Sequence, residues 1–304
     1  MAPMQGYTDC VYRRAHCECA GGVDEYYTPF VRLEGGAPRQ KDMRDIMPER
    51  NAGLPTAVQV IARDADEFAR LCDTVQAAGW SRIDLNLGCP FPMQVRAGRG
   101  CGLMLHPDRV AALADEMRRR PEVLFSAKMR LGQDDTAQGM ALVPALNEMP
   151  LLHLTVHPRL GIQQYKGTVD RGAFAALMQA LRHPVVYNGD LASRDGIETL
   201  LAEFPNLKGV MLGRGLLARP WLFSEAGRSE VLRAMHRQVY LHACQALCGD
   251  AQVLARMHAF WEYSATAPDE DAVLDRKQLK SLLKSRDRRR YDEAVAAVWR
   301  NGIR

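Results

Sequence analysis

The feature that most constrains the fold is a regular alternation of short apolar runs with longer amphipathic segments. Several runs, such as 57–61 and 152–156, are apolar at nearly every position. Continuous apolarity over about five residues is typical of parallel strands that helices cover on the outside. The eight predicted strands are residues 2–4, 25–30, 56–61, 83–87, 123–129, 151–156, 185–187 and 209–212.

The segments between these runs have helical periodicity. Residues 64–78, 107–119 and 193–203 carry apolar side chains at spacings of three and four, and Pro107 stands at a favourable helix start. Eight strands that alternate with helices predict an α/β fold of the (β/α)8 TIM barrel type rather than a doubly wound sheet. No GxGxxG motif follows the first run, which further lowers the case for a dinucleotide-binding sheet.

After Pro220 the pattern changes to helices only, at 229–247, 252–267, 272–283 and 290–300. We therefore predict a catalytic barrel over residues 1–224 and a smaller all-helical C-terminal domain over residues 225–304. The chain has a formal charge of +4, yet residues 276–304 hold ten basic residues against three acidic ones. Such a run is either a solvated helix face or a surface for RNA, because Lys and Arg neutralise phosphates.

Composition excludes several classes of protein. With 47% hydrophobic and 25% charged residues, the chain is neither disordered nor fibrous. It shows no secretion signal and no apolar run of the roughly 18 residues that a membrane span needs. We expect a monomeric cytoplasmic protein without membrane contact. None of its eight cysteines forms a CxxC pair, and we expect Cys244 and Cys248 to be core thiols on one helix face rather than zinc ligands.

Polar residues stand where the predicted strands end, and a barrel of this class has its active site at that end. The loops after strands seven and eight of such barrels commonly bind a phosphate through backbone N–H groups. Gly189 and the sequence GRG at 213–215 suit that role. The other polar residues at strand ends are Gln59, Asn86, Lys128, Arg130, His157, Arg159, Asn188 and Asp190.

Cys89 is the candidate catalytic residue. A thiol with a pKa of about 8.5 is mainly protonated at neutral pH, so it can give a proton or, once ionised, act as a nucleophile. Asn86 and Pro90 frame a turn that should expose Cys89 at the rim of the barrel. Lys128 and Arg130 share one face of their strand, where Lys128 suits either a Schiff base or an anionic flavin or phosphate.

Several motifs together resemble the tRNA-dihydrouridine synthase family. They are APM at 2–4, DLNLGCP at 84–90, KMRLG at 128–132, NGD at 188–190 and MLGRG at 211–215, in the order and spacing of that family. The resemblance implies a barrel that carries FMN and a helical domain that grips tRNA. The activity it implies is reduction of the 5,6 double bond of a specific uridine in the tRNA D-loop, with NADPH as the reductant.

The resemblance also assigns roles to residues. Cys89 would give a proton to C5 of the uracil after a hydride from reduced FMN reaches C6. Pro158 replaces the glycine usual in the family, which stiffens the loop beside the flavin. The residues that would hold FMN are Ala2, Pro3, Met4, Gln59, Lys128, His157, Asn188, Gly189, Asp190, Gly213 and Arg214. Those that would contact the tRNA are Arg32, Asn86, Arg130, Arg159, Arg276, Lys277 and Lys280.

Two other functions stay open at this point. One is an FMN-dependent reductase of a small-molecule enone or pyrimidine on the same barrel, which would not need the basic helical tail. The other is an RNA-binding protein with a vestigial barrel, which would not depend on Cys89. The sequence leaves the target uridine and the preference for NADPH over NADH undecided.

Overall fold

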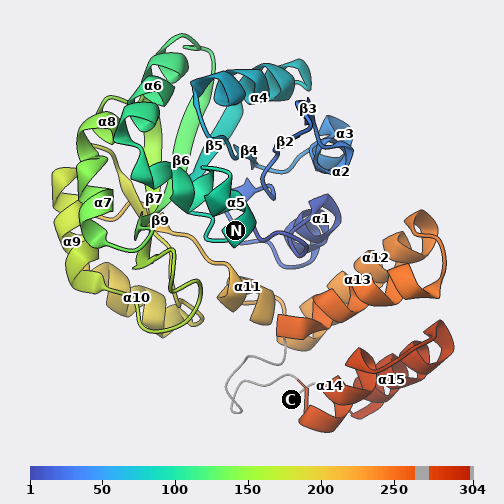
Figure 1. Ribbon diagram of the computed structural model, residues 1–304. Coiled ribbons are helices and arrows are strands. Elements are labelled where there is room, and N and C mark those ends of the chain that lie inside the picture. Colours follow the sequence, from blue (N-terminus) through green and yellow to red (C-terminus); the bar gives the residue numbers. More distant parts are fainter. Residues whose placement is uncertain (264–273, 302–304) are drawn as a thin grey trace. The chain divides into compact units, whose positions relative to one another are not determined.

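The computed structural model describes residues 1–263 and 274–301 and divides into two compact units (Figure 1). The barrel unit comprises Met1–Pro3, Glu25–Leu191 and Asp195–Leu212. The helical unit comprises Met4–Asp24, Ala192–Arg194 and Gly213–Arg304. The functional boundary between residues 224 and 225 stays a prediction.

A parallel sheet of seven strands, with neighbours in chain order, forms the centre of the barrel unit and confirms the α/β fold. The predicted strand at 2–4 is not present as a strand. Instead, the Ala2 N–H donates to the Leu212 carbonyl (2.7 Å), while the Tyr27 N–H donates to the Met1 carbonyl (3.2 Å). These two residues thus connect the first and last strands. The strands are β1 (Tyr26–Tyr27), β4 (Thr56–Val60), β5 (Arg82–Leu87), β6 (Leu124–Gly132), β7 (Leu151–Leu160), β8 (Val185–Tyr187) and β9 (Gly209–Val210).

The largest differences from the predicted strand bounds are in β1, β6 and β7, and β9 ends at Val210 rather than 212. Only Tyr26–Tyr27 of the run 25–30 is a strand, because Pro29 has no N–H to continue the pairing. Strands β6 and β7 continue to Gly132 and Leu160, so the polar residues near their ends lie inside the sheet. A short antiparallel ribbon, β2 (Leu33–Glu34) with β3 (Ala37–Pro38), was not expected.

Helices surround the sheet, as Figure 1 shows for α4, α6, α7, α8, α9 and α10. The structure confirms the three predicted helices as α4 (Ala65–Ala77), α6 (Pro107–Arg118) and α10 (Arg194–Glu203). The Asp64 side chain caps α4 by accepting from the Glu67 N–H (2.8 Å). The additional helices are α2 (Gln40–Asp45), α3 (Pro48–Asn51), α5 (Pro92–Arg96), the 3-10 helix η1 (Gly100–Leu105), α7 (Thr136–Ala141), α8 (Val143–Asn147) and α9 (Arg171–Ala180).

The helical unit confirms the four predicted C-terminal helices, with bounds that differ by one to a few residues at most ends; residues 272 and 273 of the predicted helix 272–283 lie outside the described residues. Helix α13 ends at Glu262, and the predicted continuation over 264–267 lies outside the described residues. Helix α14 begins at Arg276 because the Asp275 side chain accepts from the Gln278 N–H (2.7 Å) and caps it there. The helices are α1 (Cys10–Cys19), α11 (Arg214–Ala218), α12 (Arg228–Ala246), α13 (Asp250–Glu262), α14 (Arg276–Leu283) and α15 (Arg288–Asn301).

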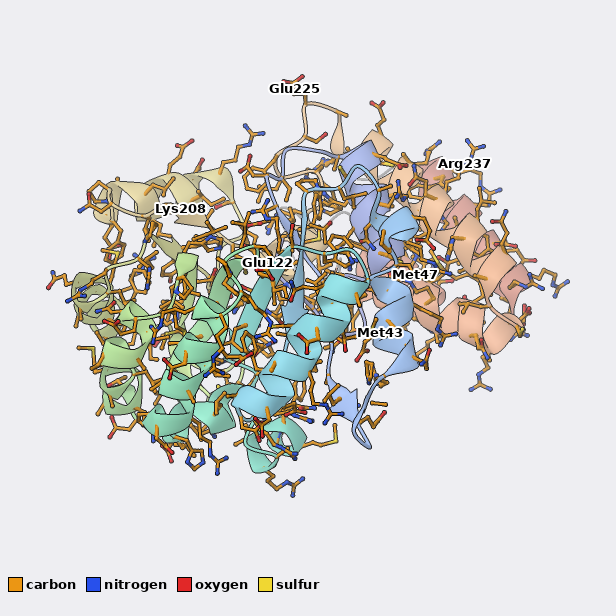
Figure 2. All side chains as sticks on the ribbon, turned by 90° about the horizontal axis from the view of Figure 1, so that it is seen from above. Met43, Met47, Glu122, Lys208, Glu225 and Arg237 are labelled. Carbon is orange, nitrogen blue, oxygen red and sulfur yellow. The ribbon has the colours of Figure 1, made fainter. Side chains whose placement is uncertain are left out.

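The core of the helical unit holds a small polar network among aromatic rings. The Tyr291 hydroxyl lies 2.8 Å from His236 Nε2 and accepts from Trp261 Nε1 (2.8 Å). Burial lowers the pKa of His236 to about 4, so this ring is neutral at neutral pH. On the other face of α12, Arg237 is exposed (Figure 2).

All eight cysteines are free. The prediction that Cys244 and Cys248 pack on one helix face is wrong, because Cys248 lies beyond the end of α12 and is exposed. Within residues 1–263 and 274–301, no group of His, Cys, Asp or Glu could hold a metal ion. Of the helices in those same ranges, none combines the length and apolarity needed to cross a membrane.

Candidate active site

A row of buried polar side chains crosses three strands inside the barrel unit. Gln59, Asp84 and Ser126 are register partners on β4, β5 and β6. Gln59 Nε2 donates to Asp84 Oδ2 (2.7 Å), and Ser126 Oγ donates to Asp84 Oδ1 (2.6 Å). Burial raises the pKa of Asp84 to about 6, although these hydrogen bonds and the charge of Lys128 act against the shift.

Two residues further along β5 and β6, a second row of polar side chains follows on the same face. Asn86 is the register partner of Lys128. Its Nδ2 donates to Gln59 Oε1 (2.7 Å), and its Oδ1 accepts from the N–H groups of Gly88 (3.0 Å) and Cys89 (2.9 Å). The Asn86 side chain therefore fixes the turn that carries Cys89.

Cys89 is enclosed rather than open. It is only 6% exposed and packs with Phe30 and Ile61, so the predicted exposure of the thiol at the rim is wrong. Burial raises the pKa of the Cys89 thiol, while a backbone hydrogen bond from Phe91 and the charges of neighbouring cations lower it by less. The thiol is consequently protonated at neutral pH.

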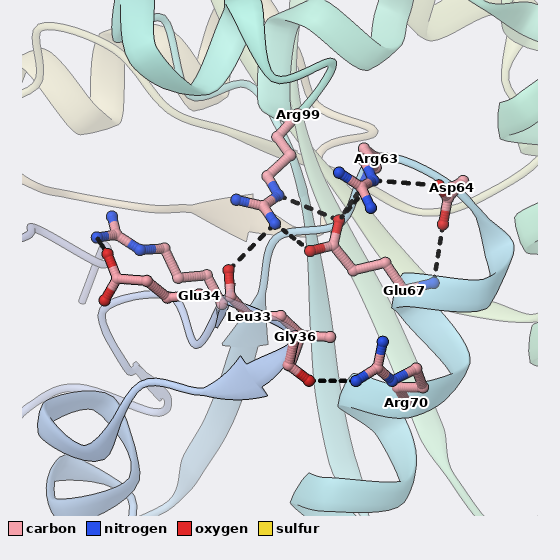
Figure 3. A network of polar contacts seen from close by, with 9 residues as sticks. Leu33, Glu34, Gly36, Arg63, Asp64, Glu67, Arg70 and Arg99 are labelled. Carbon is pink, nitrogen blue, oxygen red and sulfur yellow. Dashed lines mark hydrogen bonds and ion pairs between the residues drawn. The ribbon is translucent and has the colours of Figure 1, made fainter.

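The loop between α5 and η1 leads into residues that pack against Cys89, and a polar network around Arg99 holds this loop (Figure 3). The Arg99 guanidinium pairs with the Glu67 carboxylate and donates to the Leu33 carbonyl (3.2 Å). Two residues on, the Cys101 N–H donates to the Cys89 carbonyl (3.1 Å). The backbone of Cys89 is thus bonded to Asn86 on one side and to η1 on the other.

Lys128 is partly exposed and makes no hydrogen bond or ion pair to the residues that the structure describes. Burial, and next the charge of Arg130, lower the pKa of Lys128 to about 8. The group is therefore a cation at neutral pH without a hydrogen-bond or ion-pair partner in the described ranges. Such a group suits an anionic or hydrogen-bond-accepting ligand.

Arg130, two residues along the same strand face, is used differently. It is 2% exposed and donates to three backbone carbonyls, those of Gly88 (3.1 Å), Leu160 (3.0 Å) and Gln164 (2.7 Å). Its guanidinium also lies over the Tyr165 ring, 5.4 Å from the ring centroid. Arg130 thus ties the Cys89 turn to the segment that follows β7.

A second polar group lies where β7 and β8 end. Arg159 pairs with both carboxylate oxygens of Asp190, at 2.9 Å to Oδ1, and donates to the Gly167 carbonyl (2.7 Å). His157 Nε2 lies 3.2 Å from Arg159 Nη1. A Cβ on Gly189 would lie 3.2–3.3 Å from Val169, His157 and Pro158, so this loop sits tightly against the end of β7.

The remaining predicted site residues divide between the two units. In the barrel unit, Ala2 and Pro3 lie at the seam of the sheet, Asn188 Nδ2 donates to the Met211 carbonyl (2.7 Å), and Arg32 pairs with Glu34 (3.3 Å). Met4, Gly213, Arg214, Arg276, Lys277 and Lys280 belong to the helical unit. Within the barrel unit the structure therefore gathers Gln59, Asn86, Cys89, Lys128 and Arg130.

Asp84 and Ser126 are site residues that were not predicted from the sequence. Asp84 had a detectable signal, because an acidic residue between the apolar residues Ile83 and Leu85 of a strand is unusual unless it is paired. Ser126 had none, since a serine in a strand is not distinctive.

A basic groove lies in the helical unit on α14 and α15. Its volume is about 540 Å³, and its lining includes Lys277, Lys280, Lys284 and Arg290. The three lysines are exposed and form no ion pair with any residue in the described ranges. Arg276, at the first position of α14, is also exposed. This cationic surface matches the position of the predicted RNA contact.

Comparison with known proteins identifies related chains. A probable tRNA-dihydrouridine synthase of Rhodobacter capsulatus is 31% identical over 236 residues, covering 74% of this chain and 69% of the relative. A tRNA-dihydrouridine(16) synthase of Neisseria meningitidis is 31% identical, covering 72% and 68%. A tRNA-dihydrouridine synthase B of Xanthomonas campestris is 27% identical, covering 98% and 94%.

The similarity of this chain to solved structures concerns the fold alone. A morphinone reductase bound to tetrahydroNAD aligns with a TM-score of 0.50 and 12% identity, covering 73% of this chain and 84% of that one. The family model for dihydrouridine synthase (Dus) matches residues 1–301, nearly the full length. The chain therefore belongs to the dihydrouridine synthase family, which confirms the resemblance drawn from its motifs.

Proposed function

We propose that this protein reduces the 5,6 double bond of one uridine in the tRNA D-loop to give dihydrouridine, with FMN as cofactor and NADPH as reductant. Family membership and the names of its relatives support this reading. The observation that carries it is the enclosed, protonated thiol of Cys89 on a turn fixed by Asn86, with the cation of Lys128 close enough to affect its pKa. We further propose that the protein acts as a monomer in the cytoplasm.

The residues of the barrel unit fit a flavin. Lys128 is a cation that no side chain or carbonyl of residues 1–263 and 274–301 engages, and it suits the electron-rich edge of the isoalloxazine ring. At Gly189 an added Cβ would press on His157 and Pro158 at 3.3 Å, so the backbone of this loop lies close to the end of β7. When bound, reduced flavin supplies the hydride that adds to C6 of the uracil. We propose that the barrel unit holds FMN through Ala2, Pro3, Gln59, Lys128, His157, Asn188, Gly189 and Asp190. The flavin contacts of Met4, Gly213 and Arg214, which belong to the helical unit, stay predictions.

Cys89 would complete the reduction by giving its proton to C5. One hydride and one proton convert the C5=C6 double bond to a single bond, and the thiolate that remains takes a proton from water. The Phe91 N–H and the charges of Arg130 and Lys128 stabilise that thiolate, since each lowers the pKa of Cys89. General acid catalysis of this type contributes roughly 10²- to 10⁴-fold to the rate.

Other residues would recognise the RNA. One N–H of the Asn86 amide makes no hydrogen bond among the described residues and can donate to a uracil carbonyl, with Arg32, Arg130 and Arg159 shaping the surrounding site. The uridine must leave its stack to reach a site inside a barrel. The cations Arg276, Lys277 and Lys280 would bind the tRNA backbone, because phosphate contacts supply most affinity that does not depend on sequence.

The test is mass-spectrometric mapping of dihydrouridine in tRNA from a host that lacks the gene, after incubation with the purified protein, FMN and NADPH. We expect dihydrouridine at one position of the D-loop. Reduction of a free enone or pyrimidine with no change in the tRNA would instead support the small-molecule reductase.

The matching variant is Cys89→Ala. It should keep its affinity for FMN and tRNA but lose turnover by roughly 10²- to 10⁴-fold, the contribution of a general acid. Cys101→Ala is the control, since Cys101 is also buried and its N–H bonds to the Cys89 carbonyl. Undiminished dihydrouridine formation by Cys89→Ala would remove Cys89 from the acid role.

A further inference from the structure

A continuous chain of hydrogen bonds runs from Asp84 to the turn of Cys89, and its two ends have fixed polarity. At one end, the N–H groups of Gly88 and Cys89 can only donate. At the other end, the ionised carboxylate of Asp84 can only accept. Between these ends lie the amides of Asn86 and Gln59, each of which donates through nitrogen and accepts through oxygen.

Every link therefore runs in the same direction. The turn donates to Asn86 Oδ1, Asn86 Nδ2 donates to Gln59 Oε1, and Gln59 Nε2 donates to Asp84 Oδ2. If either amide turned over, two donors or two acceptors would face each other inside the barrel. A buried polar group left without a partner costs free energy, so the chain allows one orientation of both amides.

We propose that Asp84 is a positioning residue whose carboxylate sets the orientation of Gln59 and Asn86 and thereby holds the turn that carries Cys89. Its importance for turnover rests on the proposed function, whereas its effect on the turn does not. Asp84 is completely buried and accepts a second hydrogen bond from Ser126, so its own position is fixed. The other ionisable groups that act on it are Tyr27 of β1, Glu25 just before β1, and Lys128 of β6.

The variant that tests polarity is Gln59→Glu, which has nearly the same shape. It places a second acceptor where Gln59 Nε2 now donates at 2.7 Å. When both carboxyl groups are ionised they repel, and the new side chain withdraws from Asp84 and from Asn86. When one of them holds a proton, an O–H can donate in place of the amide, and the chain is restored.

Adding Asp84→Asn to Gln59→Glu restores the chain in a different way. The amide introduced at position 84 donates to one oxygen at position 59 and still accepts from Ser126. The other oxygen at position 59 still accepts from Asn86. Asn86 and the turn then keep their native bonds, although the negative charge has moved from one residue to its neighbour.

The readout is the hydrogen-exchange protection of the Gly88 and Cys89 amides, measured by NMR on the full chain with FMN added. We expect Gln59→Glu to lower both protection factors by roughly 10- to 100-fold at pH 8, the effect of unpairing a buried polar group, and by less at pH 5.5. The double variant should return both protection factors to within about threefold of the wild type at either pH. Its two substitutions compensate each other, because every donor of the chain again meets an acceptor.

The control amide is that of Asn188, which donates to the Val156 carbonyl (2.9 Å) elsewhere in the barrel and should not change. In the wild-type background, Asp84→Asn alone should lower the protection of the turn, because the new amide can donate to Gln59 and turn it over. Asp84→Asn thus lowers the protection of the turn in the wild-type background and raises it in the Gln59→Glu background. A residue that only filled space would not do this.

The proposal is overturned if Asp84→Asn fails to raise protection in the Gln59→Glu background, or if Gln59→Glu acts equally at both pH values. If Gln59→Glu does not fold, recovery of folded protein by the double variant is the expected result, and failure to recover it also overturns the proposal. Amide exchange requires no tRNA and no turnover. Absence of dihydrouridine formation by the wild type would therefore refute the proposed function and leave this test intact.

Discussion

Gly100 is the position where one added methyl group should disturb the site most. It begins η1 with φ at +57°, and a Cβ there would lie 2.7 Å from the Cys89 carbonyl oxygen, 2.8 Å from Cys89 Cβ and 2.9 Å from Cys89 N. These separations are far shorter than the roughly 3.5–4.0 Å at which carbon atoms pack favourably. Gly100→Ala must therefore displace Cys89 or the loop itself.

The decrease in the free energy of unfolding that Gly100→Ala causes can be estimated from two separate effects. A left-handed conformation costs an L-residue roughly 1–2 kcal/mol. Crowding in a packed site typically adds about 1–3 kcal/mol. The matched control is Gly53→Ala, because Gly53 has φ at +78° but nothing within 4 Å of its Cβ position. Gly53→Ala should lose only the roughly 1–2 kcal/mol of the left-handed conformation. Gly100→Ala should lose the sum of both effects, roughly 2–5 kcal/mol.

Urea denaturation of both variants measures this difference, and nucleoside mapping of treated tRNA measures its consequence. We expect Gly53→Ala to form dihydrouridine normally and Gly100→Ala to lose most of that activity, because its acid is misplaced. Equal destabilisation of the two variants, or full activity of Gly100→Ala, would refute the view that close packing against Gly100 positions Cys89.

Two further predictions concern the helical unit. Burial depresses the pKa of His236 from 6.5 to about 4, so between these two pH values the unfolded chain binds a proton that the folded chain does not. The stability that the neutral His236 side chain contributes is complete above pH 6.5 and is lost as pH falls through 4, by roughly 3 kcal/mol. Between pH 7 and 4, the free energy of unfolding of His236→Phe should depend less steeply on pH than that of the wild type, and an unchanged slope would contradict this. Replacing Lys277, Lys280 and Lys284 with Gln should weaken tRNA binding and flatten its dependence on log salt by up to about 3 in slope. Arg237→Gln, outside the groove, should do neither, and an unaltered slope in the triple variant would exclude the groove as a phosphate-binding surface.

The fold was largely predictable because its helices and strands report burial through periodicity. The run 57–61 and the helix at 64–78 were placed within about two residues of β4 and α4. Helix α1 was missed, and its composition explains why. Two of its buried side chains are Arg13 and His16, so its inner face does not look apolar in the sequence. Arg13 is accommodated there by donating to the Thr8 carbonyl (2.7 Å).

The chemistry at the strand ends was predictable in type but not in partnership. From their motifs, Arg159 is expected to contact the tRNA and Asp190 the flavin. The structure pairs them with each other, although 31 residues separate them. Periodicity places a side chain on a face of a strand, but it does not say which side chain from another strand end meets it. That information comes only from the closed sheet.

Lys128 and Arg130 show what this limit means for reading a site. Both are cations, and they stand two residues apart on one face of β6, so periodicity alone does not show that one has internal partners and the other does not. Arg130 donates three hydrogen bonds to backbone carbonyls, whereas Lys128 donates none to the described part of the chain. A buried donor already matched to a fixed acceptor gains little from a ligand, while an unmatched one gains the most. The two neighbours therefore have different tasks: Arg130 ties the turn of Cys89 to the segment that follows β7, and Lys128 keeps the bonding capacity that the proposed flavin contact needs.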